Sequence, residues 1–323
     1  MQRRSPQNKV EPVDQRNSHR LSNSKGNNGQ LRESRDGNPF ASQPLLRAVA
    51  IYSGAARLAE MAALMGFDAI WIEMEHGPAD FNQVESLCVS IERGGALPIV
   101  RVPDLQRHHI LRSLEVGGRV IVVPMINTAG QARQLVEHGK FPPIGSRGYN
   151  VRSRGVGYGL GSKADLFQAA NSHTYLFAQI ETTLAVENVD AICQVEGLSG
   201  IFIGPGDLSV SAGCMGELQN DRLIDMVTHC IRQAKDHGKY SGILVPPGRM
   251  LDAAIETGCN LVVCGGDVTE LQASWAQLLA RLTSRKSVDL PVESPELSLP
   301  AWALGGSRVS QAVAAAQPKV KST

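Results

Sequence analysis

The sequence predicts an α/β fold, a closed (β/α)8 TIM barrel, from three observations. Eight short apolar runs alternate strictly with eight segments of helical periodicity, which requires a parallel sheet and favours a closed barrel. Two of the runs stop abruptly at carboxylates, Glu181 and Asp207, which lie 26 residues apart, the length of one strand–helix–strand unit. No Gly-x-Gly-x-x-Gly opens a helix after the first run, which disfavours the alternative, an open doubly wound sheet.

The strands are predicted where apolar runs are bounded by turn residues: Ala48 to Tyr52, Ala69 to Glu73, Pro98 to Arg101, Val120 to Pro124, Tyr175 to Ile180, Gly200 to Ile203, Tyr240 to Leu244 and Leu261 to Cys264. The helices are predicted where apolar residues recur at helical spacing: Ala55 to Met65, Phe81 to Arg93, Arg107 to Val116, Ala129 to His138, Leu184 to Val195, Arg222 to His237, Gly248 to Thr257 and Thr269 to Ser284. Functional residues of such a barrel lie at the carboxyl ends of its strands.

The predicted barrel covers residues 45–286 and has a tail at each end. Residues 1–44 are rich in Asn, Ser, Gln and Arg without apolar periodicity, so we expect a disordered polar tail. Residues 287–323 are rich in Pro, Ser and Ala, and we expect no fixed fold apart from a short helix that Ser307 to Ala316 could form.

Composition disfavours several classes of function. The net charge of the 323 residues is +1, so nothing global indicates nucleic acid or a membrane as a partner. No apolar run has the length of a membrane span and no signal peptide is recognisable, which predicts a soluble, cytoplasmic protein. The cysteines form no C-x-x-C pair, so we expect reduced core residues rather than a zinc or disulfide framework: Cys88, Cys193, Cys214, Cys230, Cys259 and Cys264.

A glycine-rich segment, Phe141 to Lys163, interrupts the strand–helix rhythm before the fifth strand. It is longer than a connection requires, which is typical of a loop that covers a substrate or contacts another subunit. Its arginines, Arg147, Arg152 and Arg154, are either ligands of a distal anionic group or simply solvated.

The two strand-end carboxylates are a candidate metal site. Glu181 and Asp207 would emerge at the same end of the sheet, and Mg²⁺ or Mn²⁺ accepts one or two carboxylates and completes its shell with water and substrate. Gly204, Pro205 and Gly206 expose backbone amides beside Asp207, where an anionic substrate group fits. The alternative is that both acids only cap the helices that follow them.

Further polar residues converge on the same mouth. His76 lies just past the second strand, and histidine is the usual general base near neutral pH. Arg101 ends the third strand, where its forked donors suit a carboxylate or a developing enolate oxygen. With Gln179 from the fifth strand, base, cation and metal site meet, which argues for an enzyme. No lysine stands at a strand end, so Schiff-base aldolase chemistry is excluded.

Six motifs resemble those of the HpcH/HpaI family of metal-dependent (class II) pyruvate aldolases, over roughly Ala59 to Leu279: Glu75-His76-Gly77-Pro78, Val100-Arg101, Val123-Pro124-Met125, Arg147-Gly148, Gln179-Ile180-Glu181-Thr182 and Gly204-Pro205-Gly206-Asp207-Leu208-Ser209. The resemblance implies a (β/α)8 barrel of the phosphoenolpyruvate/pyruvate-binding type that assembles as a homohexamer. It also implies the roles of individual residues: Glu181 and Asp207 as ligands of Mg²⁺, Mn²⁺ or Co²⁺, Gln179, Gly204, Pro205, Gly206 and Asp207 as substrate contacts, His76 as the base and Arg101 as the cation that stabilises the oxyanion.

Two acidic positions depart from the family pattern. The residues matching Glu73 and Glu115 are aspartate in many members, where an acid raises the basicity of the histidine, and here each is one methylene longer. Glu115 ends a predicted helix at the bottom of its own barrel, so it reaches a His76 only in a neighbouring subunit, or else it is a surface acid. The first strand, Arg47 to Ser53, lacks the usual Gly and aromatic near its start, so that wall of the pocket is altered.

We therefore expect a carbon–carbon lyase that reversibly cleaves a 4-hydroxy-2-oxo acid to pyruvate, or a close 2-oxo acid, and an aldehyde. One alternative is an acyl-CoA lyase of the citrate lyase β or malyl-CoA lyase type, although no basic cluster in the barrel loops indicates a nucleotide groove. The other is a non-catalytic barrel that acts as a binding protein. The expected partners are small molecules and further copies of the chain, without nucleic acid or membrane.

Overall fold

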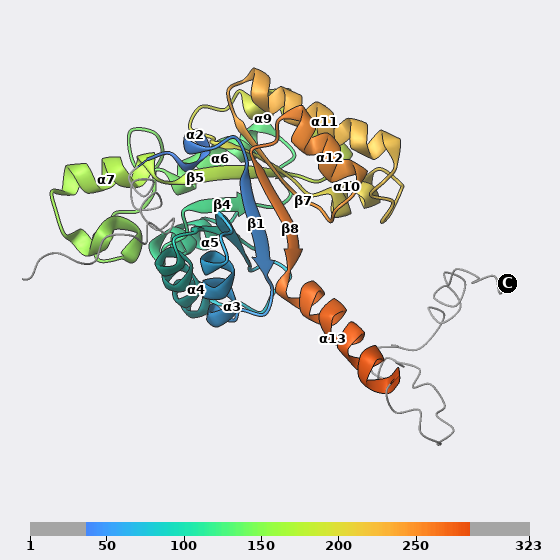
Figure 1. Cartoon of the computed structure of the whole chain (residues 1–323). Helices are drawn as coiled ribbons and strands as arrows, with labels where there is room; N and C mark the ends of the chain where they lie inside the picture. Colours follow the sequence, from blue (N-terminus) through green and yellow to red (C-terminus); the bar gives the residue numbers. More distant parts are fainter. Residues whose placement is uncertain (1–36, 285–323) are drawn as a thin grey trace, which may run out of the picture. The chain divides into compact units, whose positions relative to one another are not determined.

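The computed structural model describes residues 37–284 and confirms the predicted barrel. Its eight strands are all parallel and pair in chain order. The barrel closes where β8 pairs with β1, and these two strands lie side by side in Figure 1. Each strand lies within two residues of its predicted range: β1 Leu46–Ile51, β2 Ala69–Glu73, β3 Leu97–Arg101, β4 Val120–Val123, β5 Tyr175–Ile180, β6 Gly200–Ile203, β7 Tyr240–Leu244 and β8 Leu261–Gly266.

Most helices also lie within two residues of their predicted ranges: α3 Ala56–Leu64, α4 Phe81–Gly94, α5 Arg107–Glu115, α6 Ala129–Gly139, α11 Asp221–Asp236, α12 Arg249–Thr257 and α13 Asp267–Ser284. The single helix predicted from Leu184 to Val195 is instead two, α8 (Thr183–Glu187) and α9 (Val189–Cys193), which meet at Asn188 with its non-helical ψ of 3°. Four short elements were not predicted: α2 Pro39–Ser42, η2 Arg154–Gly159, α7 Lys163–Ser172 and α10 Pro205–Ser211.

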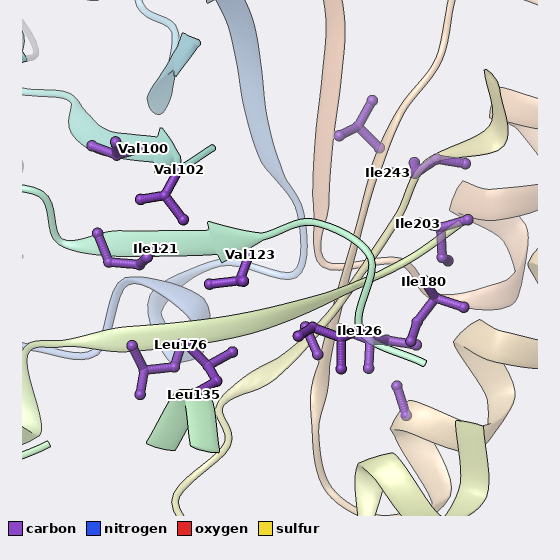
Figure 2. Close-up of a cluster of buried hydrophobic side chains, with 14 of the residues drawn as sticks. Val100, Val102, Ile121, Val123, Ile126, Leu135, Leu176, Ile180, Ile203 and Ile243 are labelled. Carbon is purple, nitrogen blue, oxygen red and sulfur yellow. The ribbon is translucent and has the colours of Figure 1, made fainter. Parts of the chain in front are cut away.

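Two apolar layers hold the barrel together, because successive strand residues point to opposite faces of the sheet. Inside the barrel, Trp71, Phe177 and Phe202 belong to one buried cluster. Outside, strand residues pack against the helices in a second and larger cluster, part of which is shown in Figure 2, where Leu135 of α6 joins Leu176 of β5. The inward-facing row of β2 thus continues from Trp71 to Glu73 at the strand's carboxyl end.

The segment predicted to be a disordered tail is structured from residue 37 onward. Phe40 in α2 is 5% exposed and its ring stacks on Tyr240 at 4.5 Å and meets Tyr175 edge-on at 5.2 Å. One aromatic side chain therefore covers the amino ends of β5 and β7, which the polar composition of residues 1–44 concealed. The remaining tail predictions, for residues 1–36 and 287–323, fall outside the described residues.

The chain divides into two compact units, Met1–Gln272 and Ala273–Thr323. The eight strands and the first turns of α13 belong to the former, and the rest of α13 belongs to the latter. In residues 37–284 no helix is both long and apolar enough to cross a membrane. Six free cysteines are found there: four are buried, as predicted for core residues, and Cys214 and Cys264 are half-buried.

Two buried cations lie at the start of the glycine-rich segment. Lys140 donates from Nζ to the backbone oxygens of Asn171 and Thr174, each at 2.6 Å. Arg147 is 4% exposed and lies over the ring of Phe141 at 4.6 Å, so it is a buried residue and not a solvated one.

The other two arginines of this segment differ from Arg147. Arg154 pairs with Glu92 of α4, whereas Arg152 is exposed. Of the three, Arg152 is the one that matches the solvated alternative.

Candidate active site

Glu73 ends β2 and is completely buried. Its Oε2 accepts hydrogen bonds from Nε of Arg101 at 2.8 Å and from the indole N–H of Trp71 at 3.0 Å, and Nη2 of Arg101 lies 2.6 Å away. Its Oε1 accepts from the backbone amides of Glu75 at 2.7 Å and His76 at 3.1 Å. A buried carboxylate requires such partners, and here they tie the end of β3 to the loop after β2.

The loop that carries His76 folds tightly over Glu73. A Cβ added at Gly77 would lie 2.6 Å from the backbone oxygen of Glu73, which is closer than side chains tolerate. The side chain of His76 is exposed, and the contact with Glu73 runs through its backbone amide. Glu73 therefore positions the loop and the guanidinium of Arg101, which gives it a structural role in the site besides the effect on histidine basicity implied by the family pattern.

Arg101 is a fixed cation at the carboxyl end of β3. Its side chain is 9% exposed, and Nη1 lies 3.1 Å from Oε2 of Glu75. Burial lowers the pKa of Arg101, but the hydrogen bond and charge of Glu73, together with the charges of Glu75 and Glu181, outweigh burial and raise the pKa above its ordinary value. Burial raises the pKa of Glu75 despite the opposing charge of Arg101. The guanidinium thus stays charged among acids of β2 and β5.

Glu181 follows β5 and is 2% exposed. Its Oε1 accepts a 2.6 Å hydrogen bond from the backbone amide of Met125, and its Oε2 accepts one of 2.6 Å from the side-chain amide of Gln179. Burial, helped by the charges of Asp207 and Glu75 and opposed by the Met125 amide and the charge of Arg101, raises the pKa of Glu181 to about 7. The N–H donors favour the carboxylate anion, but burial outweighs them, so Glu181 is a poorly solvated anion.

Asp207 stands in the first turn of α10, exposed at the same end of the barrel. The chain reaches it through Gly204, where an added Cβ would lie 2.8 Å from both Nε2 of Gln179 and Oε2 of Glu181. Pro205 is buried as the first residue of α10, and an added Cβ at Gly206 would meet nothing within 4 Å. The residues Gly204 to Asp207 therefore form a close-fitting wall beside the Gln179–Glu181 pair, open above Gly206.

Glu115 is not brought to His76 within one chain. It is the last residue of α5, and its carboxylate accepts a 2.8 Å hydrogen bond from the side-chain amide of Asn150 in the glycine-rich segment. Burial lowers the pKa of Arg147 in that segment to about 10, while the charge of Glu115 opposes this shift. Helices of the barrel end at the amino ends of the strands, opposite the mouth, as the sequence predicted.

Three further residues contact these candidates without having been selected from the sequence. Trp71 donates to Glu73, the Met125 amide donates to Glu181, and Glu75 flanks Arg101. Trp71 precedes Glu73 by two residues in the strand, and this spacing alone predicts that both side chains face the same side of the sheet. Met125 has a left-handed backbone with φ of 57°, and nothing in its residue type indicates that conformation.

Comparison with known proteins places the chain in a family. Residues 51–273 match the sequence model of the family described as HpcH/HpaI aldolase/citrate lyase. The chain belongs to this family.

Hydroxypyruvate/pyruvate aldolase of Roseobacter denitrificans is 32% identical over 229 residues, covering 69% of this chain and 87% of that relative. The 5-keto-4-deoxy-D-glucarate aldolase of Klebsiella pneumoniae is 33% identical over 219 residues, covering 68% and 85%. The protein is therefore an enzyme, a carbon–carbon lyase.

Solved structures agree with this membership of the HpcH/HpaI family. A HpcH/HpaI aldolase/citrate lyase family protein from Burkholderia cenocepacia superposes with a TM-score of 0.69 at 27% identity, covering 79% of this chain and 99% of that chain. A HpcH/HpaI aldolase from Desulfitobacterium hafniense superposes with a TM-score of 0.73 at 24% identity, covering 80% and 99%, which supports the fold alone.

The donor set of this HpcH/HpaI family member suits a hard divalent cation. Within residues 37–284 no group of three or more His, Cys, Asp or Glu side chains forms a complete metal cage. Three oxygen-bearing groups lie near one another instead: the buried carboxylate of Glu181, the carboxylate of Asp207 and the buried Oε1 of Gln179, which has no hydrogen-bond partner. Two carboxylates with open positions are the arrangement that Mg²⁺ or Mn²⁺ accepts, because water and substrate oxygens complete its shell.

Proposed function

We propose that the protein is a divalent-metal-dependent aldolase that reversibly cleaves a 4-hydroxy-2-oxo acid to pyruvate, or a close 2-oxo acid, and an aldehyde. The observation that carries this proposal is the pairing of two opposite environments at one mouth. Glu181, beside Asp207, is a buried anion that needs a cation, and Arg101 is a buried cation locked in place by Glu73. A 2-oxo acid offers a carboxylate and an oxo oxygen, which would complete the ligand shell of a divalent cation held by Glu181 and Asp207, and Arg101 supplies N–H donors for an oxygen that gains charge. The names of the two relatives agree with such substrates.

The residues of the chain supply the proton transfer and the charge stabilisation. His76 removes the proton of the C4 hydroxyl, the C4–O bond becomes the carbonyl of the aldehyde, and the electrons of the C3–C4 bond form an enolate. Arg101 donates N–H groups to the C2 oxygen as its charge grows, and protonation at C3 completes pyruvate. A bound divalent cation supplies a Lewis acid that draws electron density from the 2-oxo group, worth several kcal/mol.

A substrate panel tests the proposal. The purified protein, stripped of metal and then given Mn²⁺, is offered 4-hydroxy-2-oxo acids of different length, and pyruvate release is followed by its reduction to lactate. We expect release that depends on Mn²⁺ and is lost in His76→Ala. Cleavage of acyl-CoA thioesters without cleavage of free oxo acids would replace the proposal with a CoA lyase.

The proposal includes a homohexamer, and Glu115 supplies its test. Glu115 ends α5 and His76 follows β2, so the two lie at opposite ends of one barrel, and Glu115 reaches a histidine only across a subunit boundary. Sedimentation should give the mass of six chains. Glu115→Gln and His76→Ala proteins, unfolded together and refolded as a mixture, should regain activity that neither has alone. A fully active Glu115→Gln protein would remove this role.

A further inference from the structure

We propose that Trp71 is a positioning residue of the reaction: with Glu73, its indole N–H holds the guanidinium of Arg101 in one orientation at the barrel mouth. This inference rests on the proposed function, in which Arg101 donates to the C2 oxygen. Trp71 is completely buried in the interior cluster, two residues before Glu73 on the same face of β2.

Three side chains from two neighbouring strands form a closed set of contacts. Trp71 Nε1 and Arg101 Nε donate to the same oxygen, Oε2 of Glu73, at 3.0 and 2.8 Å. The guanidinium carbon of Arg101 in turn lies over the indole ring, 5.6 Å from its centre. Arg101 is therefore held by a carboxylate and by the face of an aromatic ring, two interactions that restrict different directions of movement.

The indole N–H decides where the carboxylate of Glu73 points. Oε1 receives the backbone amides of Glu75 and His76, and Oε2 receives Trp71 and Arg101, so rotation of the carboxylate would displace the cation and the His76 loop together. Trp71 contributes the donor that opposes this rotation from below, inside the barrel. Phenylalanine at this position would keep an aromatic face for Arg101 and lose only the donor and the second ring.

Kinetics of Trp71→Phe test the role, with metal-dependent exchange of the methyl protons of pyruvate as the assay. We expect kcat to fall about tenfold, the effect of one lost hydrogen bond to a charged group, with a smaller change in KM. Phe202→Leu is the matched control, because Phe202 packs against Trp71 at 4.7 Å between ring centres and has no polar atom. An equal fall of kcat in Phe202→Leu would show that packing alone matters and overturn the proposal.

A double-mutant cycle separates positioning from general damage. If Trp71 acts through Glu73, Trp71→Phe should cause little further loss of kcat in a Glu73→Asp protein, since the shorter side chain has already moved the carboxylate. Independent, multiplicative losses from the two substitutions would contradict the proposal. Both proteins retain a base, a cation and the carboxylates, so their activities stay measurable.

A spectroscopic measurement needs no substrate. The chain has three tryptophans, so protein labelled with ¹⁵N at the indole nitrogen gives three signals, and Trp71 is assigned by its loss in Trp71→Phe. The Trp71 signal should exchange slowly with deuterated solvent and shift in Glu73→Asp. A signal that does not respond to Glu73→Asp overturns the inference about Trp71, whatever the activity. Wild-type protein without pyruvate exchange, in contrast, overturns the proposed function itself.

Discussion

The backbone amide of Met125 donates a 2.6 Å hydrogen bond to Oε1 of Glu181, and Met125 makes this contact with a left-handed backbone, φ 57°. A non-glycine residue in this conformation is strained, and such strain concentrates at functional sites. The loop after β4 therefore holds its conformation at a cost in free energy. Its Met125 amide donates to Glu181, the candidate metal ligand.

Substitutions at Met125 should separate strain from side-chain loss. Met125→Gly relieves the left-handed backbone, whereas Met125→Val adds a β-branched residue that disfavours it. We expect the valine protein to have an unfolding free energy about 1–2 kcal/mol lower than the glycine protein in urea denaturation, and to bind Mn²⁺ more weakly. Equal stability of the two proteins would show that the strain is not real.

Glu181→Gln should remove metal binding while stabilising the metal-free protein. Glutamine keeps the size of the side chain and removes a buried charge whose pKa burial has raised to about 7. We expect no Mn²⁺ binding by calorimetry and, at pH 8, an unfolding free energy about 1–3 kcal/mol above that of metal-free wild type. Asp252→Asn, at an exposed position of α12, is the control. Retained Mn²⁺ affinity in Glu181→Gln would move the metal site elsewhere.

Gly77→Ala should loosen the His76 loop. The added methyl group would lie 2.6 Å from the backbone oxygen of Glu73, so the loop must move. We expect a loss of stability of about 1–3 kcal/mol and a larger proportional loss of kcat, because His76 immediately precedes Gly77 in the same loop. In Gly130→Ala, where the nearest atom lies 3.6 Å away, both quantities should stay near wild type. Normal activity in Gly77→Ala would refute the tight-loop argument.

The lowered pKa of Lys140 predicts how the free energy of unfolding depends on pH. Burial, together with the smaller effect of the charge of Arg147, lowers its pKa to about 8, whereas the unfolded chain has the ordinary lysine value of 10.5. Between these values the unfolded chain binds more protons than the folded one, so the contribution of Lys140 makes the unfolding free energy rise with pH from about 8 to about 10.5.

Lys140→Met tests this sign. The unfolding free energy, measured by urea denaturation, should increase less between pH 8 and pH 10 in Lys140→Met than in wild type. Lys163→Met, at an exposed lysine, should keep the wild-type slope. Parallel slopes for wild type and Lys140→Met would mean that this lysine is not buried as described.

The strands were predictable because each apolar run is bounded by turn residues or by a carboxylate. Tyr175–Ile180 and Gly200–Ile203 begin and end where turn residues and carboxylates stand, and both ranges match the structure. Short helices were not predictable in the same way. In α10, Gly204, Pro205 and Gly206 read as a break in regular structure, yet Pro205 occupies the first helical position, where proline is favoured.

The sequence predicted which charged residues form the site, but not the hydrogen bonds that hold them in place. Arg101, Glu181 and Asp207 follow from strand-end positions in a parallel barrel. The hydrogen bonds of Trp71 and Met125 depend on a side-chain face and on one backbone dihedral angle, which residue type alone does not determine. Phe40 shows the same limit, since a single aromatic in a polar segment gives no periodic pattern.

Exchange of the methyl protons of pyruvate with deuterated water tests the central claim most directly. Enolate formation at the mouth predicts deuterium incorporation, followed by NMR, that requires added Mg²⁺, Mn²⁺ or Co²⁺ and is lost in both His76→Ala and Glu181→Gln. The experiment needs no knowledge of the aldehyde. Absence of exchange with all three metals would contradict the account and favour a CoA-dependent lyase or a barrel that does not act on free 2-oxo acids.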